Sequence, residues 1–220
     1  YEIFLILILT PTYHPKKLVS YNFYQHYGKR IFDFTMAFLG LIFLSPLLLI
    51  LSLVIKLDSA GSVVFKQVRV GQNSKPFYLY KFRSMVSNAS KLGLAVTSGD
   101  DPRITKTGRF LRKYKLDELP QLINVVKGEI SLVGPRPEVE RYVQAYPKEY
   151  AQILQIKPGI TDYAAIEFRN EEEILNQYED KEEAYINKIL PAKIKLYQKY
   201  LNKISFLEDL RLIVLTFKKI

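Results

Sequence analysis

The sequence has 220 residues, of which 48% are hydrophobic and 25% charged, so it is long enough for one substantial domain and too apolar for a disordered chain. It contains no cysteine, which excludes disulfides and thiolate metal sites. Its two histidines, His14 and His26, precede the main apolar segment, so neither a histidine zinc site nor a Ser-His-Asp triad is expected. Any metal would be held by oxygen ligands, which Mg²⁺ and Mn²⁺ prefer. The net charge of +10 suits an anionic partner such as phospholipid, nucleic acid or a phosphorylated substrate.

The first 27 residues carry no pattern that predicts a role. The sequence begins at Tyr1 rather than Met, so we expect that the natural start is missing or altered. The apolar run at 3–9 is too short to span a bilayer, and no basic region precedes it as in a signal peptide. It is either the tail of a lost upstream span or a stub that lies on a surface.

Residues 31–55 form an apolar segment in which Asp33 is the only charged residue. As a straight helix the segment would reach roughly 37 Å, which exceeds a hydrocarbon core of about 30 Å. Pro46, however, lacks the N–H that an internal helix position needs, and the preceding Ser45 can bond a carbonyl that the proline frees. The two pieces would measure roughly 22 Å and 14 Å, each too short to span.

Basic residues lie on both sides of this segment, at positions 16, 17, 29 and 30 before it and at 56, 66 and 69 after it. Positive charge at both ends fits two ends that face the cytoplasm. We therefore predict a re-entrant membrane segment, a helix-break-helix that enters and leaves by one leaflet and is broken at Ser45 and Pro46. An ordinary kinked spanning helix is the alternative, and a fully buried core helix fits the length less well.

A β-hairpin is predicted next, with strands at 63–70 and 77–82. The polar residues 86–101 are expected to form a loop. Residues 104–115 are expected to form a short basic helix or turn. Further elements follow along the chain: a helix over 119–127 that Gly128 can end, a tight turn over 131–137, and a helix over 138–156 that Lys157-Pro158-Gly159 ends.

Two amphipathic helices are predicted at the end of the chain, over 190–204 and 206–217. The apolar stripe of each could lie on a membrane surface or pack on the domain core, and the pattern fits both. The predicted fold is α+β and mainly helical, with a re-entrant membrane helix and a small cytosolic domain that carries a hairpin and interfacial helices. Its parts are an N-terminal segment (1–27), the membrane hairpin (28–57) and a catalytic domain (58–220).

Two adjacent carboxylates, Asp117 and Glu118, stand in the string Leu116-Asp117-Glu118-Leu119-Pro120 at a predicted helix start. Free backbone N–H groups and the helix dipole would keep them ionised there. One carboxylate could attack phosphorus while the other holds a cation. An isolated Asp-Glu pair in this position is more often a simple helix cap.

Basic residues beside several predicted turns strengthen the functional interpretation. Arg136 stands between Pro135 and Pro137, which fix the local backbone, and a rigidly presented guanidinium suits phosphate binding. Taken singly, such arginines are most often solvated surface residues. Together with the carboxylate pair they indicate phosphoryl transfer, which depends on positioning and on charge neutralisation. The other basic candidates are Lys81, Arg83, Arg109 and Arg112.

An ordered set of motifs resembles the monotopic phosphoglycosyl transferases, the bacterial sugar transferase family. The set covers residues 28 to about 170, and its most specific part is LDELPQL followed by VGPRP downstream of a Ser-Pro in an apolar helix. The other matching strings are KR with Asp33, VFKQVRVG, YKFRSM, DPRITKTGRFLRK and KPGIT. After KPGIT many members have Gly, whereas this chain has Asp162 followed by Tyr-Ala-Ala-Ile, as in small stand-alone members, some of which use N-acetylated amino sugars.

The resemblance implies a two-step reaction. Asp117 would attack the β-phosphate of a UDP-sugar and release UMP, and polyprenyl phosphate would then take the phosphosugar from the aspartate. Glu118, with Asp117, would hold Mg²⁺. The Pro135-Arg136-Pro137 turn would bind the nucleotide or its phosphates, as would Arg112. Lys81 and Arg169 match phosphate contacts, and Ser45-Pro46 matches the helix break.

The resemblance also implies a setting: the cytosolic face of a bacterial inner membrane, with anionic membrane lipid as a partner and no nucleic acid. The helical stripes leave room for a homodimer. A non-catalytic membrane adaptor with the same fold is the main alternative, although the intact carboxylate pair speaks against it. A membrane-tethered nucleic-acid binder fits the charge, but the sequence shows no recognition motif.

Overall fold

The computed structural model describes residues 23–86, 89 and 101–219. The predictions made for residues 1–22 and for most of the 86–101 loop lie outside the described residues. Within them the fold is mainly helical α+β, as predicted, with two small sheets of two strands each. A π-helical turn, η2 (Tyr24–Gly28), leads into the long apolar helix α1 (Lys29–Asp58).

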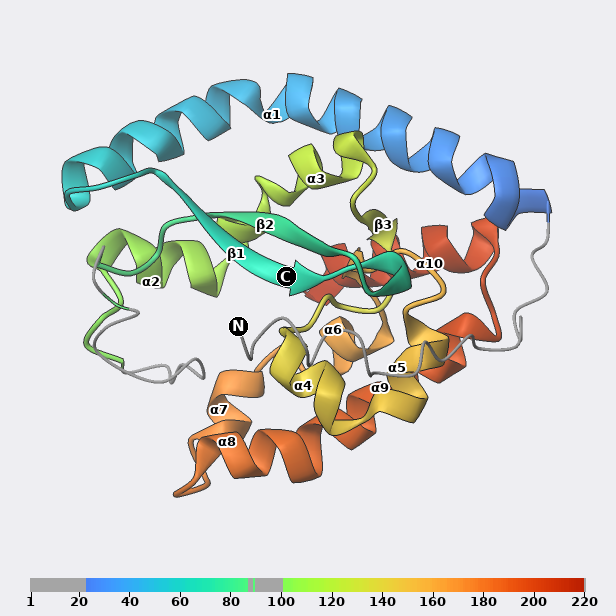
Figure 1. Ribbon diagram of the computed structural model, residues 1–220. Coiled ribbons are helices and arrows are strands. Elements are labelled where there is room, and N and C mark those ends of the chain that lie inside the picture. Colours follow the sequence, from blue (N-terminus) through green and yellow to red (C-terminus); the bar gives the residue numbers. More distant parts are fainter. Residues whose placement is uncertain (1–22, 87–88, 90–100, 220) are drawn as a thin grey trace, which may run out of the picture.

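Helix α1 runs through Pro46 without a break in its secondary structure, so the predicted interruption of the helix is wrong. The Ser45 hydroxyl donates to the Ile42 carbonyl at 2.8 Å, which is the carbonyl that an N–H at position 46 would have bonded in a regular helix. The side chain therefore replaces the missing backbone bond. Figure 1 shows the consequence: α1 is an arch, with both ends bent toward the rest of the protein.

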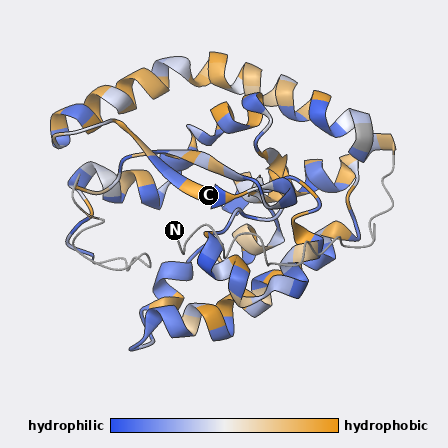
Figure 2. Cartoon of the chain, viewed as in Figure 1, coloured by the Kyte–Doolittle hydropathy of each residue, from blue (hydrophilic) through white to orange (hydrophobic). Residues whose placement is uncertain are grey.

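The α1 helix packs on the domain along its whole length. Near its start the buried Asp33 accepts from the Leu132 backbone N–H at 3.1 Å. Near its end the buried Ile55 packs with Phe82 and Leu111. The opposite face is exposed and apolar, as the orange colouring of α1 in Figure 2 illustrates. The most exposed large apolar residues of α1 are Ile31, Phe43, Leu49 and Leu57. By length and composition α1 qualifies as a membrane helix.

The predicted hairpin is confirmed as β1 (Val64–Val70) and β2 (Pro76–Phe82), an antiparallel pair. A short 3₁₀ turn, η3 (Gln72–Ser74), joins them. Under α1 the hairpin packs against α3 (Gln121–Lys127), which confirms the helix predicted there. The predicted basic helix is α2 (Lys106–Lys113).

A second sheet was not predicted. Strands β3 (Ser131–Val133) and β4 (Gly159–Thr161) pair in parallel, where the sequence had indicated only a turn and a helix stop. The two strands approach closely because Gly134 and Gly159 face each other: a Cβ on Gly159 would lie 2.1 Å from the Gly134 nitrogen. The single helix predicted over 138–156 is also wrong, because Pro147 starts a new helix.

Further helices complete the domain. They run in the order α4 (Glu140–Ala145), α5 (Pro147–Ile153), α6 (Tyr163–Glu167), α7 (Glu171–Leu175), α8 (Lys181–Ala184), the π-helical η6 (Tyr185–Ile189), α9 (Leu190–Leu201) and α10 (Phe206–Lys219). Figure 1 shows α4, α7, α8 and α9 on the side away from α1, whereas α10 returns to the start of α1. The two predicted C-terminal helices are thus confirmed.

The two C-terminal helices differ in what covers their apolar stripes. On α9 the stripe is buried, with Leu190 and Tyr197 at 0% exposure, so the membrane-surface interpretation of this helix is wrong. On α10, Leu210 and Phe217 remain 42% and 75% exposed. The start of α10 also lies beside the start of α1, where Phe206 stacks edge-on against Phe32. The exposed apolar surface of α1 therefore continues onto α10.

Replacing Asn124 with alanine is expected to lower the free energy of unfolding by about 3 kcal/mol. The fully buried Asn124 side chain accepts from the Tyr80 N–H at 3.0 Å and donates to the Tyr78 carbonyl at 2.7 Å, so it pairs the free edge of β2. Its loss takes the partner from the Tyr80 N–H and the Tyr78 carbonyl, both in partly buried bonds, and unpaired groups of this kind cost about 1–3 kcal/mol each. Denaturant unfolding in detergent would measure this. Asn176→Ala at an exposed position is the control, and equal effects of the two changes would contradict the prediction.

Candidate active site

The two adjacent carboxylates lie in a short 3₁₀ helix, η5 (Leu116–Glu118), rather than in the first turn of α3. The residue before it, Lys115, has a positive φ of 54°, an uncommon conformation for a residue with a side chain. This left-handed residue turns the chain sharply between α2 and η5. As a result Asp117 and Glu118 face the end of the hairpin.

Glu118 binds two cations that come from distant parts of the chain. Its carboxylate accepts from the Lys81 ammonium of β2 at 2.9 Å and from the Arg136 guanidinium, one of whose bonds measures 3.2 Å. Burial raises the pKa of Glu118, but Arg136 and Lys81 outweigh burial and hold the pKa well below its ordinary range. The Glu118 carboxylate is therefore ionised and joins the hairpin to the turn at residue 136.

Asp117 is buried, with 8% of its surface exposed. Its Oδ1 atom has no hydrogen-bond partner among the residues that the structure describes. Burial raises the pKa of Asp117, and the positive charges of Lys81, Arg112 and Lys115 oppose that rise. The Asp117 carboxylate is thus a buried acceptor without a partner, surrounded by positive charges. These charges can hold an anionic, phosphorylated ligand next to it.

Arg112 and Arg83, predicted from neighbouring strings, differ in what they contact. The Arg112 Nε donates to the Ser84 hydroxyl at 3.0 Å, and its NH1 pairs with Glu172 of α7 at 3.0 Å. Arg83 is buried and donates to the Ser59 carbonyl at 2.6 Å, which ties the end of α1 to the hairpin. This contact anchors the chain, but the Nε and Nη1 atoms of Arg83 are buried without a hydrogen-bond partner among the described residues, so its role at the substrate stays a prediction. Arg169 lies half-buried just after α6, and its role stays a prediction.

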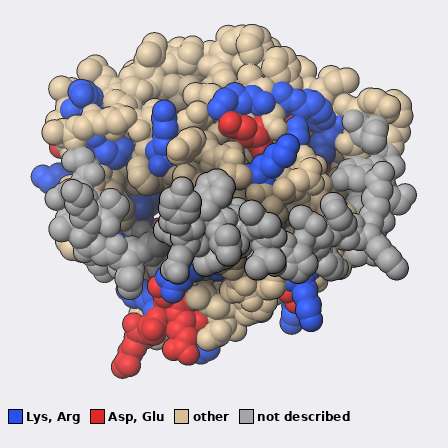
Figure 3. Space-filling view, in the orientation of Figure 1, with Lys and Arg blue, Asp and Glu red and all other residues tan. Residues whose placement is uncertain are grey.

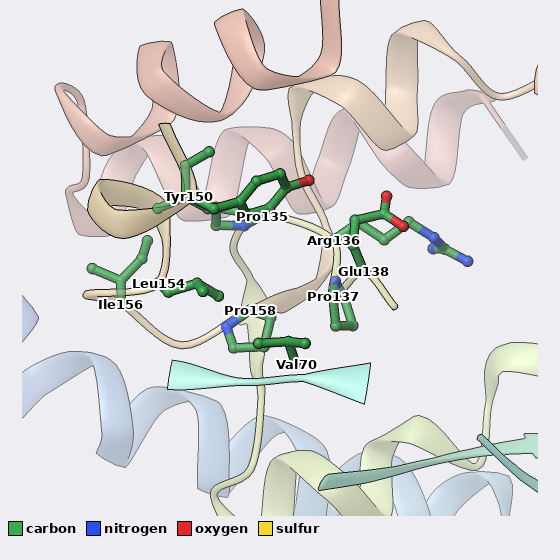
Figure 4. A pocket seen from close by; sticks show the side chains of 10 residues that line it. Val70, Pro135, Arg136, Pro137, Glu138, Tyr150, Leu154, Ile156 and Pro158 are labelled. Atoms are coloured by element: carbon green, nitrogen blue, oxygen red, sulfur yellow. The ribbon is translucent and has the colours of Figure 1, made fainter. Parts of the chain in front are cut away.

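The turn that presents Arg136 is packed from behind by apolar residues. Figure 4 shows Pro135, Pro137 and Pro158 around a small pocket with Tyr150 above and Val70 below. The Arg136 and Glu138 side chains extend away from the apolar end of this pocket. The rigid packing lets the turn present its one guanidinium to Glu118.

Sequence reasoning did not assign a role to two buried carboxylates next to this turn. Asp162 accepts from the Arg136 backbone N–H at 3.2 Å. Glu138 accepts from the Tyr185 hydroxyl at 2.7 Å and lies 3.6 Å from the Lys193 ammonium. Two signals in the sequence could have pointed to these residues. Asp162 departs from the family pattern, and Glu138 directly follows the Pro-Arg-Pro string, but neither signal indicates burial.

The described residues contain no group of three or more Asp, Glu, His or Cys side chains that could hold a metal by themselves. The donor set that is present, two carboxylates of which Asp117 keeps an unpartnered oxygen, fits Mg²⁺, which is commonly bound by one or two carboxylates together with substrate phosphates. Since Glu118 is already paired with Lys81 and Arg136, Asp117 would be the more available of the two carboxylates for a metal.

Charge is distributed unevenly over the face of the protein shown in Figure 3. Lys and Arg atoms gather along the border under α1, around one acidic patch, whereas the other acidic atoms in this view gather mainly at the opposite edge, over α7 and α8. The apolar surface of α1 and the basic border next to it thus lie on the same side of the protein. Such a side suits an interface of apolar chains and anionic head groups.

Comparison with known proteins shows the family. The family model of the bacterial sugar transferases matches residues 24–220. The chain is 40% identical over 192 residues to the "Uncharacterized sugar transferase EpsL" of Bacillus subtilis, a match that covers 87% of this chain and 86% of that protein.

Several relatives carry names that state an activity, among them the following two. The undecaprenyl-phosphate glucose phosphotransferase of Komagataeibacter xylinus is 39% identical over 198 residues, which is 87% of this chain and 35% of that protein. The UDP-glucose:undecaprenyl-phosphate glucose-1-phosphate transferase of Escherichia coli is 40% identical over 163 residues, 70% of this chain and 34% of that protein. The chain therefore spans only about a third of the length of these two relatives.

Proposed function

Because the chain belongs to the bacterial sugar transferase family, we propose that it transfers a sugar-1-phosphate from a UDP-sugar to undecaprenyl phosphate. The observation that carries the proposal is the geometry at residue 117: a buried carboxylate oxygen without a described partner, next to a carboxylate that Lys81 and Arg136 bind. The names of the relatives support the reaction class.

The first step forms a covalent intermediate on Asp117. A carboxylate oxygen attacks the β-phosphorus of the UDP-sugar, and the bond from that phosphorus to the bridging oxygen breaks. UMP leaves with the bond electrons on its phosphate. Lys81, Arg112 and Arg136 neutralise the charge that the diphosphate brings and that the transition state spreads over the phosphoryl oxygens.

The second step regenerates the carboxylate. An oxygen of the lipid phosphate attacks the same phosphorus and displaces Asp117, which gives undecaprenyl diphosphate-sugar. When bound, Mg²⁺ would supply further positive charge to the diphosphate, with Asp117 and Glu118 as its protein ligands. An N-acetylated amino sugar is the favoured donor, given the departure at Asp162.

The experiment that tests this function combines the purified protein, a panel of UDP-sugars, Mg²⁺ and undecaprenyl phosphate. We expect one or a few donors to yield UMP and a lipid-linked product in equal amounts. If no donor yields UMP, the protein is better described as a membrane adaptor with the same fold.

Acid is expected to slow the first step at a higher pH than it would for an exposed aspartate. The reactive form of Asp117 is the ionised one, and burial raises its pKa, so protonation begins at a higher pH than usual as the pH falls. UMP release in a single turnover without lipid acceptor, measured against pH, would show this. Lys81 opposes the rise, so Lys81→Met should move the fall in rate to still higher pH. A shift to lower pH would contradict this account.

We also propose that α1 is re-entrant and that the site faces the cytosol of the inner membrane. Both ends of α1 are bound to one domain, the start through Lys29 and Asp209 and the end through Arg83 and Ser59. A helix that crossed the bilayer would have to release one of these ends. Figure 1 shows α1 arching over the domain with both ends bent toward it, and its outer residues such as Phe43 and Leu49 are apolar and exposed, which supports a helix that dips into one leaflet.

Cysteine labelling in inverted membrane vesicles should place both ends of α1 on one side. The 220 residues contain no cysteine, so a single introduced thiol is the only one in this chain. Tyr27→Cys and Ala60→Cys, both exposed, should react with a membrane-impermeant maleimide from the cytosolic side. Phe43→Cys, at the middle of the exposed apolar face, should react from neither side. Ends that label from opposite sides would establish a spanning helix.

A further inference from the structure

The guanidinium of Arg136 belongs to a turn that lies outside the helices and strands. Three backbone contacts hold this turn to the segment 159–162. The Gly134 N–H donates to the Thr161 carbonyl at 3.0 Å, and the Gly159 N–H donates to the Pro135 carbonyl at 2.9 Å. The third contact is the Arg136 N–H, which donates to the Asp162 carboxylate at 3.2 Å.

The third contact differs from the other two because its acceptor is a side chain. The Asp162 carboxylate uses its two oxygens for two different segments: Oδ2 accepts from the Arg136 N–H, and Oδ1 accepts from the Ala165 N–H at 2.6 Å. Asp162 thus caps the start of α6 and fixes the position of residue 136 at the same time. A shorter capping residue would perform only the first of these tasks.

The position of Asp162 is costly for a carboxylate, since only 1% of its surface is exposed. Burial raises its pKa to about 6, opposed by the two backbone donors and by Lys193 and Arg136. A helix cap at the surface has no such cost, as Asp180 at the start of α8 illustrates. Its exposed carboxylate accepts from two backbone N–H groups of α8 itself, at 3.0 Å and 2.8 Å.

We propose that Asp162 is a positioning residue of the transferase site: its carboxylate holds the backbone of Arg136 against the start of α6, so that the guanidinium meets the substrate phosphates beside Glu118. The proposal rests on the proposed function, because it assigns Arg136 to the donor phosphates. Asp162 itself does not touch the substrate. Its effect on the reaction must therefore pass through Arg136.

A double-mutant cycle separates this role from that of a cap. Asp162→Ser keeps a good N-cap residue but is too short to reach residue 136. We expect it to raise the KM for the UDP-sugar and to lower kcat/KM about 10-fold, with the midpoint of thermal unfolding close to that of the control Asp180→Ser. In an Arg136→Ala background the same change should lower kcat/KM less than about 2-fold, since the group being positioned is gone.

Equal losses in the two backgrounds, or no loss in either, would overturn the role of Asp162. If Asp162→Ser fails to fold, the longer Asp162→Asn, which keeps one acceptor oxygen, takes its place in the cycle. The cycle is also run on the affinity for UMP, measured by calorimetry, because this readout needs no turnover. If the wild-type protein binds UMP but produces no UMP from any UDP-sugar, the proposed function is contradicted. The cycle of UMP affinities would still decide the role of Asp162.

Discussion

Asp117→Asn is expected to reduce UMP release from the UDP-sugar by about 10³-fold or more, which is the range seen when a covalent nucleophile is removed. The amide has nearly the same shape but is a far weaker nucleophile. Asp117 lies in the middle of a short helix, and its Oδ1 atom makes no hydrogen bond with the described residues. The substitution therefore removes no hydrogen bond at that atom. Initial rates of UMP release at saturating donor and acceptor measure the effect.

Asp58→Asn serves as the control for this experiment. Asp58, the last residue of α1, is exposed, and its carboxylate accepts from the Thr107 N–H of α2. It should keep the wild-type rate within about 2-fold, as surface changes generally do. An Asp117→Asn protein with the wild-type rate would assign the reaction to a direct attack of the lipid phosphate on the UDP-sugar.

Arg136→Ala is expected to lower kcat/KM for the UDP-sugar by about 10²–10³-fold, the usual loss when one group that stabilises transition-state charge is removed. The change also takes one of two cations from Glu118, whose pKa should then rise toward its ordinary range, since Arg136 is the main cause of its depression. Steady-state kinetics over a range of donor concentrations would separate the losses in kcat and KM.

Arg136→Lys tests whether charge alone is enough. A lysine cannot reproduce the forked pair of bonds that the guanidinium makes with Glu118, so only partial rescue is expected. Arg141→Ala is the matched control: this arginine, from the adjacent α4, is 65% exposed and pairs with Glu182. Losses of the same size for Arg136→Ala and Arg141→Ala would show that the effect does not come from the site.

Local sequence patterns predicted the elements whose partners are close in the chain. The hairpin follows from two alternating strands across a short turn, and α3 follows from an apolar stripe that ends at Gly128, which takes a positive φ of 82°. The parallel pair β3–β4 escaped prediction because each strand has only three residues and its partner lies across the helices α4 and α5. Nothing local marks such a strand, since its pairing depends on tertiary contact.

Chemistry in the sequence predicted part of the site, and burial decided the rest. Adjacent carboxylates and a proline-framed arginine were visible as motifs, and the structure brings Lys81, Glu118 and Arg136 together. Arg83 looked equivalent to Lys81, two positions away, but the two side chains enter different surroundings. Similarly, the stripes of α9 and α10 have the same period, and only the fold shows that the first packs inward while the second stays exposed.

The central claim is that Asp117 carries the phosphosugar between donor and acceptor, and mass spectrometry of the protein tests it most directly. The protein is mixed with UDP-sugar and Mg²⁺ without undecaprenyl phosphate, quenched in acid and digested. The account predicts a phosphosugar adduct on the peptide that contains Asp117, formed with one UMP per adduct and lost when undecaprenyl phosphate is added before the quench. Full turnover with acceptor but no adduct without it, or an adduct on any other residue, would contradict the account.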